Sequence, residues 1–156
     1  AAALAEALRA HGPRIHLETH GVAAGALAAV LPHVDVVSMD WKLASDVRRA
    51  TDAKSAAPRS FAAEHRAFLA LARRAPRVVV KLVITPASGD AEIDEAIEAT
   101  AELAPEATLV LQPVTPHGPV RERPDPARML TLSRRAEARL RDVRLIPQTH
   151  PIYGVL

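Results

Sequence analysis

The chain has 156 residues, 49% of them hydrophobic and 24% charged, so we expect one compact domain over residues 1–156. Twenty Lys and Arg residues against 18 Asp and Glu residues give a net charge of +2, too small a surplus for a nucleic-acid-binding arm. The sequence has no cysteine, which excludes disulfides, thiolate zinc sites and any iron–sulfur cluster held by this chain alone.

Neither a transmembrane helix nor a signal peptide is expected. Apolar runs stay well below the roughly 18 residues that cross a bilayer, and no basic segment followed by a hydrophobic one opens the chain. We therefore expect a soluble, cytoplasmic protein that binds no membrane. The opening residues AAALAEALRA carry Leu4 and Leu8 at helical spacing without a capping residue, so we expect a fragment that starts within a helix.

Helices and strands are predicted to alternate along the chain. In order, we expect helix 1–10, strand 14–18, helix 22–31, strand 34–39, helix 60–74, strand 77–84, helix 90–103, strand 108–111, helix 127–140 and strand 143–146. Residues 43–58 are ambiguous between a loop and a broken helix, and residues 113–126 form a Pro-rich loop.

Two of these elements carry the clearest patterns. Residues 77–84 read RVVVKLVI, a nearly continuous β-branched run that predicts a strand covered on both faces. The helix at 90–103 is expected to be capped by Asp90 and to bury Ile93 and Ile97. The glutamates of this helix are expected to face water: Glu92, Glu95, Glu98 and Glu102.

Strands that alternate with helices of about ten residues or more imply parallel β-α-β units. The pattern fits either an open doubly wound sheet or part of a (β/α) barrel, and periodicity does not choose between them. Both architectures place functional groups at the carboxyl ends of the strands.

Polar residues do cluster where the predicted strands end. The segments are ETHG at 18–21, SMDWK at 38–42, TP at 85–86, QPVTPHG at 112–118 and QTH at 148–150. Parallel strands would bring them to one rim, which predicts a site. Other interpretations remain open: Glu18 and Thr19 as helix caps, Asp40 and Lys42 as a solvent-exposed ion pair, and Trp41 as a packing residue.

The histidines divide into two groups. His20, His117 and His150 lie at predicted strand ends and could bind a divalent metal with Glu18 or Asp40, although no HxH or HExxH spacing supports this. We therefore predict no metal-binding residue. The others that could be placed are expected in turns or on helix surfaces: His11, His33 and His65.

Taken together, five segments in order resemble the C-terminal two thirds of a radical S-adenosylmethionine enzyme, most closely the 7-carboxy-7-deazaguanine synthase family. They are LETHG at 17–21, VDVVSMDWK at 34–42, VVVKLVIT at 78–85, LQPVTP at 111–116 and PQTHPIYGVL at 147–156. The resemblance implies an α/β fold that is a partial (β/α) barrel of parallel strands with outer helices, a truncated barrel of the radical-SAM type.

The resemblance also implies a reaction. In this family a reduced [4Fe-4S] cluster on three cysteines cleaves S-adenosylmethionine to a 5′-deoxyadenosyl radical. That radical starts the Mg²⁺-assisted conversion of 6-carboxy-5,6,7,8-tetrahydropterin to 7-carboxy-7-deazaguanine with loss of ammonia, a step toward queuosine. The intact protein would then be a lyase served by an electron donor such as flavodoxin. The cluster cysteines are absent here, so we expect the chain alone to be inactive.

Residue by residue, the resemblance implies two sets of contacts and no catalytic side chain in this part. The pterin contacts would be Glu18, Thr19, Gln112, Gln148 and His150. The S-adenosylmethionine contacts would be Ser38, Lys42, Val83 and Thr85. The sequence departs from the family pattern at His20, at Met39 to Trp41, at Thr115 and at Pro151.

Two alternatives remain beside this reading. One is a glycyl-radical-activating or other radical S-adenosylmethionine enzyme with a protein substrate, since MDWK resembles the DxK pattern of the activating enzymes. The other is a non-catalytic α/β nucleotide-binding module. Because a truncated barrel exposes an edge strand and apolar helix faces, we also expect strand pairing or a homodimer.

Overall fold

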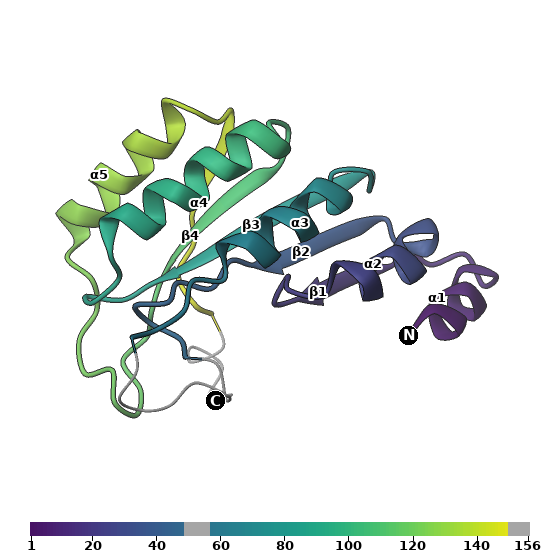
Figure 1. Ribbon diagram of the computed structural model, residues 1–156, viewed down its shortest axis with the longest axis horizontal. Coiled ribbons are helices and arrows are strands. Elements are labelled where there is room, and N and C mark those ends of the chain that lie inside the picture. The colour runs from purple at the N-terminus through teal and green to yellow at the C-terminus, as the bar shows by residue number, and fades with distance from the viewer. Residues whose placement is uncertain (49–56, 150–156) are drawn as a thin grey trace.

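The computed structural model describes residues 1–48 and 57–149, in which strands and helices alternate (Figure 1). In chain order the elements are α1 (Ala2–Arg9), β1 (His16–Thr19), α2 (Ala24–Val30), a short 3-10 helix (Leu31–His33), β2 (Val36–Asp40), α3 (Ala62–Ala72), β3 (Arg77–Ile84), α4 (Asp90–Leu103), β4 (Thr108–Pro113), α5 (Pro126–Glu137) and β5 (Asp142–Leu145). None of these helices is long and apolar enough to cross a membrane.

The strands form one parallel sheet whose spatial order follows the chain, β1-β2-β3-β4-β5. A doubly wound sheet would reverse its order at a switch point, whereas a (β/α) barrel adds each strand to the same growing edge. In the described part of the chain, β1 and β5 are the two edges of an open sheet. The prediction of an α/β fold with a partial barrel is therefore confirmed, and the doubly wound alternative is wrong.

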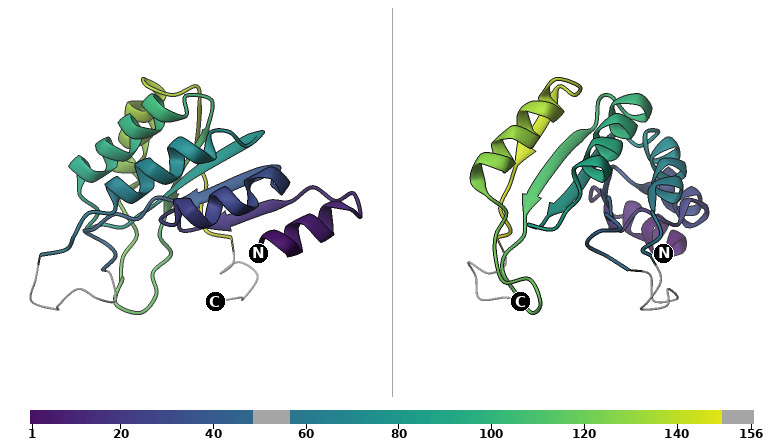
Figure 2. Two further views of the ribbon diagram at one scale, coloured as in Figure 1. Left: turned by 45° about the vertical axis from the view of Figure 1, so that its right-hand side comes forward. Right: turned by 60° about the vertical axis from the view of Figure 1, so that its left-hand side comes forward.

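All the crossing helices lie on one side of the sheet (Figures 1 and 2). Right-handed crossovers that always step in the same direction have this result. On β2 and β3, burial alternates along the strand, and Met39, Val80 and Leu82 are fully buried against the helices. The prediction that β3 is covered on both faces is corrected, because the alternate residues of β3 are only partly buried.

Element ends depend on a few local contacts. The β3 and α4 ranges match the prediction, but Gly89 occupies the N-cap position of α4, and the Asp90 carboxylate pairs with arginines of α5 instead of capping its own helix. The α5 helix begins at Pro126 because Asp125 caps it, accepting the Ala127 N–H at 2.9 Å.

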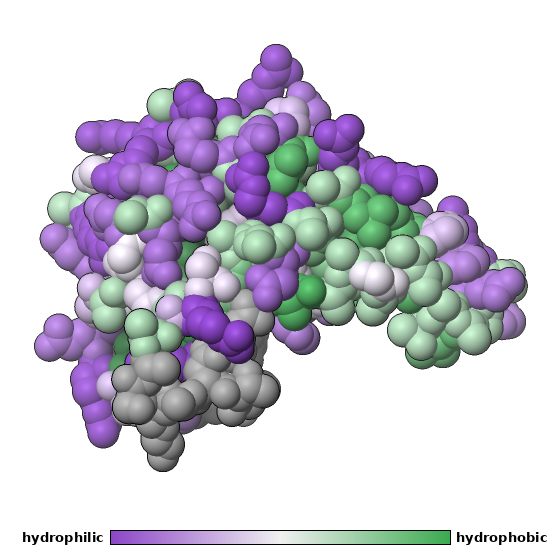
Figure 3. All heavy atoms as spheres, in the orientation of Figure 1, coloured by the Kyte–Doolittle hydropathy of each residue, from purple (hydrophilic) through white to green (hydrophobic). Residues whose placement is uncertain are grey.

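The surface is uneven in polarity. Hydrophilic residues cover the α4 and α5 side, whereas hydrophobic residues gather toward α1 and α2 (Figure 3). On α1, Leu4 is 64% and Leu8 43% exposed. Two arginines of α5 pair with acids of α4: Arg128 with Asp90, and Arg135 with Asp90 and Asp94. Arg139, just after α5, pairs with Glu98 of α4.

Gly21 makes the turn from β1 to α2 possible. Its φ is +62°, and an added Cβ would lie 2.7 Å from the Cε and 3.2 Å from the Cβ of Met39. Both backbone conformation and space therefore require glycine here.

We expect Gly21→Ala to lower the free energy of unfolding by about 1–3 kcal/mol, because alanine would hold a left-handed conformation against Met39. Gly25 is the matched control: it lies within α2 with no atom near its added Cβ, so Gly25→Ala should stabilise the chain by about 0.5–1 kcal/mol. Urea titration measures both, and equal effects would contradict the assignment of Gly21.

Candidate functional site

A hollow of about 680 Å³ opens at the carboxyl ends of β1 and β2. It is lined by Glu18, Thr19, His20, Val22, Asp40, Lys42, Val47, Arg48 and Phe61. Three residues predicted to contact ligands, Glu18, Thr19 and Lys42, therefore lie around one space. This is the rim at which the parallel topology places functional groups.

An ionic cluster of Glu18, Asp40, Lys42 and Lys81 borders the hollow. Asp40 lies between two ammoniums, with Lys42 Nζ 2.8 Å from its Oδ2 and Lys81 Nζ 2.8 Å from its Oδ1. Lys81 also lies 3.2 Å from Oε1 of Glu18. The Asp40 side chain is only 22% exposed, so the interpretation of Asp40 and Lys42 as a solvent-exposed pair is wrong.

Sheet register explains why these charges meet. Asp40 of β2 is paired in register with Lys81 of β3, so both side chains leave the same face of the sheet on adjacent strands. Sequence reasoning missed Lys81 as a site residue. The signal in the sequence is one lysine inside the run 78–84, whose other residues are all apolar.

The ionic cluster holds its charges firmly at neutral pH. Burial raises the pKa of Asp40, but hydrogen bonds and charge from Lys42 and Lys81 outweigh it and leave that pKa below 3.8. Burial lowers the pKa of Lys81, but Asp40 and Glu18 outweigh it and leave that pKa above 10.5. Groups whose pKa values move away from neutrality are poor proton carriers and good fixed charges, so this arrangement suits binding of a charged ligand.

Several other predicted site residues share the face of the sheet that no described helix covers. Ser38 is in register with Glu18, and Gln112 is in register with Val83. Ser38, Val83 and Gln112 are partly buried, whereas the Glu18 side chain is 70% exposed. Thr19 alternates to the other face, and its Oγ1 accepts the Gly21 N–H at 3.3 Å within the turn.

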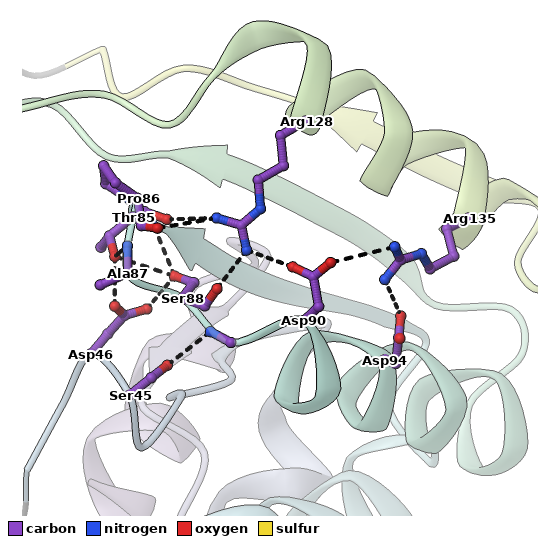
Figure 4. Close-up of polar contacts among 11 residues, drawn as sticks. Ser45, Asp46, Thr85, Pro86, Ala87, Ser88, Asp90, Asp94, Arg128 and Arg135 are labelled. Atoms are coloured by element: carbon purple, nitrogen blue, oxygen red, sulfur yellow. Dashed lines mark hydrogen bonds and ion pairs between the residues drawn. The ribbon is translucent and has the colours of Figure 1, made fainter.

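Thr85 lies in the turn between β3 and α4, where its side chain is already bonded (Figure 4). The hydroxyl donates to Asp46 Oδ1 at 2.6 Å and accepts the Ala87 N–H at 3.0 Å, and the residue is 8% exposed. Asp46 also accepts a hydrogen bond from the Ser88 hydroxyl. Thr85 therefore fastens the turn to the segment after β2.

Arg128 of α5 holds the same turn from the other side (Figure 4). Its guanidinium donates to the carbonyls of Thr85 at 3.3 Å, Pro86 at 3.4 Å and Ser88, and its Nη2 pairs with Asp90 Oδ1 at 2.6 Å. One planar guanidinium thus donates hydrogen bonds to three backbone carbonyls of the turn.

The carboxyl end of β5 carries the remaining predicted residues. Gln148 Oε1 accepts the Thr115 N–H at 2.7 Å, which brings the segment after β5 to the loop after β4. Both residues are partly buried. His150, predicted as a pterin contact, lies outside the described residues.

His65 is the largest correction to the sequence analysis. It was expected on a helix surface, but it is fully buried on α3. Its Nδ1 lies 2.8 Å from the Gly21 carbonyl oxygen and its Nε2 accepts the Lys42 N–H at 2.9 Å. Its position on the apolar side of the helix, one turn after Phe61 and before Phe68 and Leu69, was the signal available.

The segment after β2 is held by further contacts. Glu92 of α4 was expected to face water, but its carboxylate accepts the N–H groups of Ala44 at 3.0 Å and Ser45 at 3.1 Å. Trp41 is 3% exposed, which confirms the packing interpretation of this residue. The segment that carries Lys42 is therefore fixed from α3, α4 and the turn before α4.

The predicted histidines do not assemble with acids into a metal centre in the described ranges. His20 lines the hollow, whereas His117 lies in the loop after β4. Within residues 1–48 and 57–149, no group of three or more His, Cys, Asp or Glu residues could hold a metal ion.

Comparison with known proteins finds a relative that matches almost the whole chain. No family model matches the chain. The chain is 38% identical over 149 residues to a 7-carboxy-7-deazaguanine synthase of Geobacter sulfurreducens, a match that covers 96% of this chain and 55% of the relative. The chain thus spans about half the length of the curated relative that it matches. The resemblance expected from the five sequence segments is confirmed.

We expect Asp40→Asn to lower the pKa of Lys81, because burial would then be offset by Glu18 alone. NMR titration of the Lys81 ammonium measures this. Since the folded-state pKa of Asp40 lies below 3.8, its stabilising contribution is present above that pH and is lost as the pH falls through the folded value. Asp142→Asn, at the opposite end of the sheet, is the control and should leave Lys81 unchanged; an unchanged Lys81 in Asp40→Asn would contradict the ionic cluster.

We expect Arg128→Ala to lower the free energy of unfolding by about 2 kcal/mol, because two part-buried carbonyls lose a charged donor. Arg128→Lys should recover only part of this loss, since one ammonium cannot span the same set of oxygens. Arg134→Ala, an exposed arginine of the same helix, should change stability by less than about 0.5 kcal/mol. Thermal and urea unfolding measure the three variants. If Arg134→Ala lowered the free energy of unfolding as much as Arg128→Ala, the role of Arg128 in holding the turn would be contradicted.

Proposed function

We propose that this chain is the C-terminal part of a 7-carboxy-7-deazaguanine synthase. The observation that carries the proposal is the 38% identity along 96% of the chain. The fold supports it, because an open, sequentially ordered parallel sheet is what part of a (β/α) barrel would form. The complete enzyme would be a radical S-adenosylmethionine lyase that converts 6-carboxy-5,6,7,8-tetrahydropterin to 7-carboxy-7-deazaguanine with loss of ammonia.

The residues of this chain do not fit a [4Fe-4S] cluster, because none of them is cysteine. We therefore assign cluster binding to the part of the complete enzyme that this chain does not match. The described residues also offer no three-ligand set for Mg²⁺. What this chain contributes is the binding surface for the two organic molecules.

The charges beside the uncovered face of the sheet support binding of S-adenosylmethionine there. When bound, this cofactor supplies the radical that abstracts hydrogen from the pterin. Lys42 would pair with the methionyl carboxylate, Ser38 would hydrogen-bond the ribose, and Val83 would pack beside the adenine. The Thr85 hydroxyl is already bonded to Asp46, so Thr85 would act by shaping the turn next to the adenine.

The pterin would lie where the loops after β1, β4 and β5 approach the same rim. Glu18 has a carboxylate 70% exposed beside Lys81 and would accept hydrogen bonds from the pterin amino groups. Gln112 and Gln148 offer amides that match alternating donors and acceptors at a heterocycle edge. Thr19 would support the turn next to Glu18, and His150 would complete the pocket from the C-terminal segment.

Three properties of the complete enzyme follow from the same proposal. An electron donor such as flavodoxin would reduce the cluster, and the reaction would take place in the cytoplasm. Within residues 1–48 and 57–149, β1 and β5 are the edges of the sheet, and Leu4 and Leu8 of α1 are exposed. Both features support a homodimer in which a second copy covers apolar surface.

The test joins this chain to the part of the Geobacter sulfurreducens relative that it does not match. With a reductant, S-adenosylmethionine and 6-carboxytetrahydropterin, the chimera should release 7-carboxy-7-deazaguanine and ammonia, whereas the 156-residue chain alone should cleave no S-adenosylmethionine. Lys42→Met should weaken S-adenosylmethionine binding by roughly tenfold, the loss of one charge-assisted contact. Arg134→Ala is the matched control. If the chimera cleaved S-adenosylmethionine but did not convert the pterin, the assigned substrate would be wrong. If the 156-residue chain alone cleaved S-adenosylmethionine, the assignment of cluster binding to the other part of the enzyme would be wrong.

A further inference from the structure

His65 joins two loops that border the hollow. It is fully buried on α3, at the centre of a contact between the turn after β1 and the segment after β2. Nδ1 meets the carbonyl oxygen of Gly21 at 2.8 Å, and Nε2 meets the backbone N–H of Lys42 at 2.9 Å. Glu18 and Thr19 precede the first contact in the chain, and Lys42 itself makes the second.

The chemistry of these two partners fixes the state of the ring. A carbonyl oxygen only accepts and a backbone N–H only donates, so Nδ1 must carry the hydrogen and Nε2 must present its lone pair. A second proton on Nε2 would point at the Lys42 N–H, where there is no acceptor. The two hydrogen bonds can therefore both form only while the His65 ring is neutral.

The surroundings of the ring also disfavour its charged form. Burial lowers the pKa of His65 below 6.5, and the nearby Lys42 ammonium adds to that effect. Hydrogen bonding to Gly21 and the charge of Glu64, on the same helix, act in the opposite direction but are outweighed. The rings of Trp41 and Phe61 pack beside the imidazole, with centroids 4.9 Å and 6.0 Å away.

We propose that His65 is a positioning residue that locks the β1–α2 turn to the segment carrying Lys42, and that protonation of its ring releases this lock. The inference goes beyond the proposed function, because it concerns the geometry of the hollow whichever ligand occupies it. Protonation breaks the Lys42 contact, so Lys42 loses its fixed backbone beside Asp40. Ligand binding at this rim would then weaken in acid before the fold itself is lost.

The direction of the stability effect follows from linkage. The unfolded chain binds a proton on this histidine near pH 6.5, and the folded chain binds it only at lower pH. The contribution of neutral His65 is therefore fully present above pH 6.5 and is lost as the pH falls through the folded-state pKa.

The single tryptophan of the chain, Trp41, is a probe for the test, because its ring packs beside His65 at a tilt of 35°. Tryptophan fluorescence and amide hydrogen exchange are measured from pH 8 to pH 4 on the 156-residue chain and three variants. His65→Gln keeps one donor and one acceptor but cannot be protonated, His65→Phe keeps the ring without the hydrogen bonds, and His117→Gln removes an exposed histidine as control.

In the unchanged chain and in His117→Gln, we expect one fluorescence transition below pH 6.5, with roughly tenfold faster exchange of the Lys42 amide relative to its intrinsic rate. Amides of β3 should stay protected throughout. His65→Gln should show neither change. In His65→Phe the Lys42 amide should exchange rapidly at every pH; should this variant fail to fold, the comparison with His65→Gln still decides.

Either of two results would overturn the inference. One is the same pH profile in the unchanged chain and in His65→Gln. The other is an equal loss of protection at Lys42 and across β3, which would mean that His65 supports the fold as a whole. Neither measurement requires a ligand, so the outcome is independent of the proposed reaction.

Discussion

The register between β2 and β3 is the constraint on which the rim depends. It places Asp40 opposite Lys81 on the face of the sheet that the helices leave uncovered. Because side chains alternate between faces, a slip of one residue would turn Asp40 toward the apolar helix side and leave the Lys81 ammonium without its closest carboxylate. The apolar residues on the other face, Met39, Val80 and Leu82, oppose the same slip. Core packing and charge pairing thus specify one alignment.

At the carboxyl-end rim of the sheet, different residues hold the backbone and face a ligand. Three residues hold the backbone: His65 on α3, Glu92 on α4 and Thr85 in the turn before α4. Their polar atoms are already hydrogen-bonded to backbone groups or to Asp46. Glu18 and Lys42 keep polar atoms accessible at the hollow. A rim built in this way can present fixed charges on short loops, because the loop conformation is determined by elements behind it.

The sequence pattern predicted those features that depend on residues close together in the chain. The β3 and α4 ranges follow from uninterrupted periodicity, and the polar strand ends correctly predicted that Glu18, Thr19 and Lys42 would lie together. Strand order was not predictable, since it depends on contacts between distant segments. The same limit applies to His65 and Glu92, whose partners lie 44 and 48 residues away, and to Asp90, whose arginine lies 38 residues away. In the sequence alone, a buried polar residue cannot be told from an exposed one, because its hydrogen-bond partner lies far away along the chain.

The arginine bridges between α4 and α5 also compensate for a cost of the parallel topology. Two helices that each return along parallel strands point the same way, so their positive ends lie near each other and so do their negative ends. Near the C-terminal ends of the two helices lies a hollow of about 520 Å³. It is lined by Glu98, Ala101 and Glu102 of α4 and by Ala138 and Arg139 just after α5. Acids of α4 attract the guanidiniums of Arg135 and Arg139, and this attraction opposes the repulsion between like ends of the two parallel helix dipoles. Because that attraction is screened by salt, whereas apolar packing is not, the contact between these two helices weakens as the ionic strength rises.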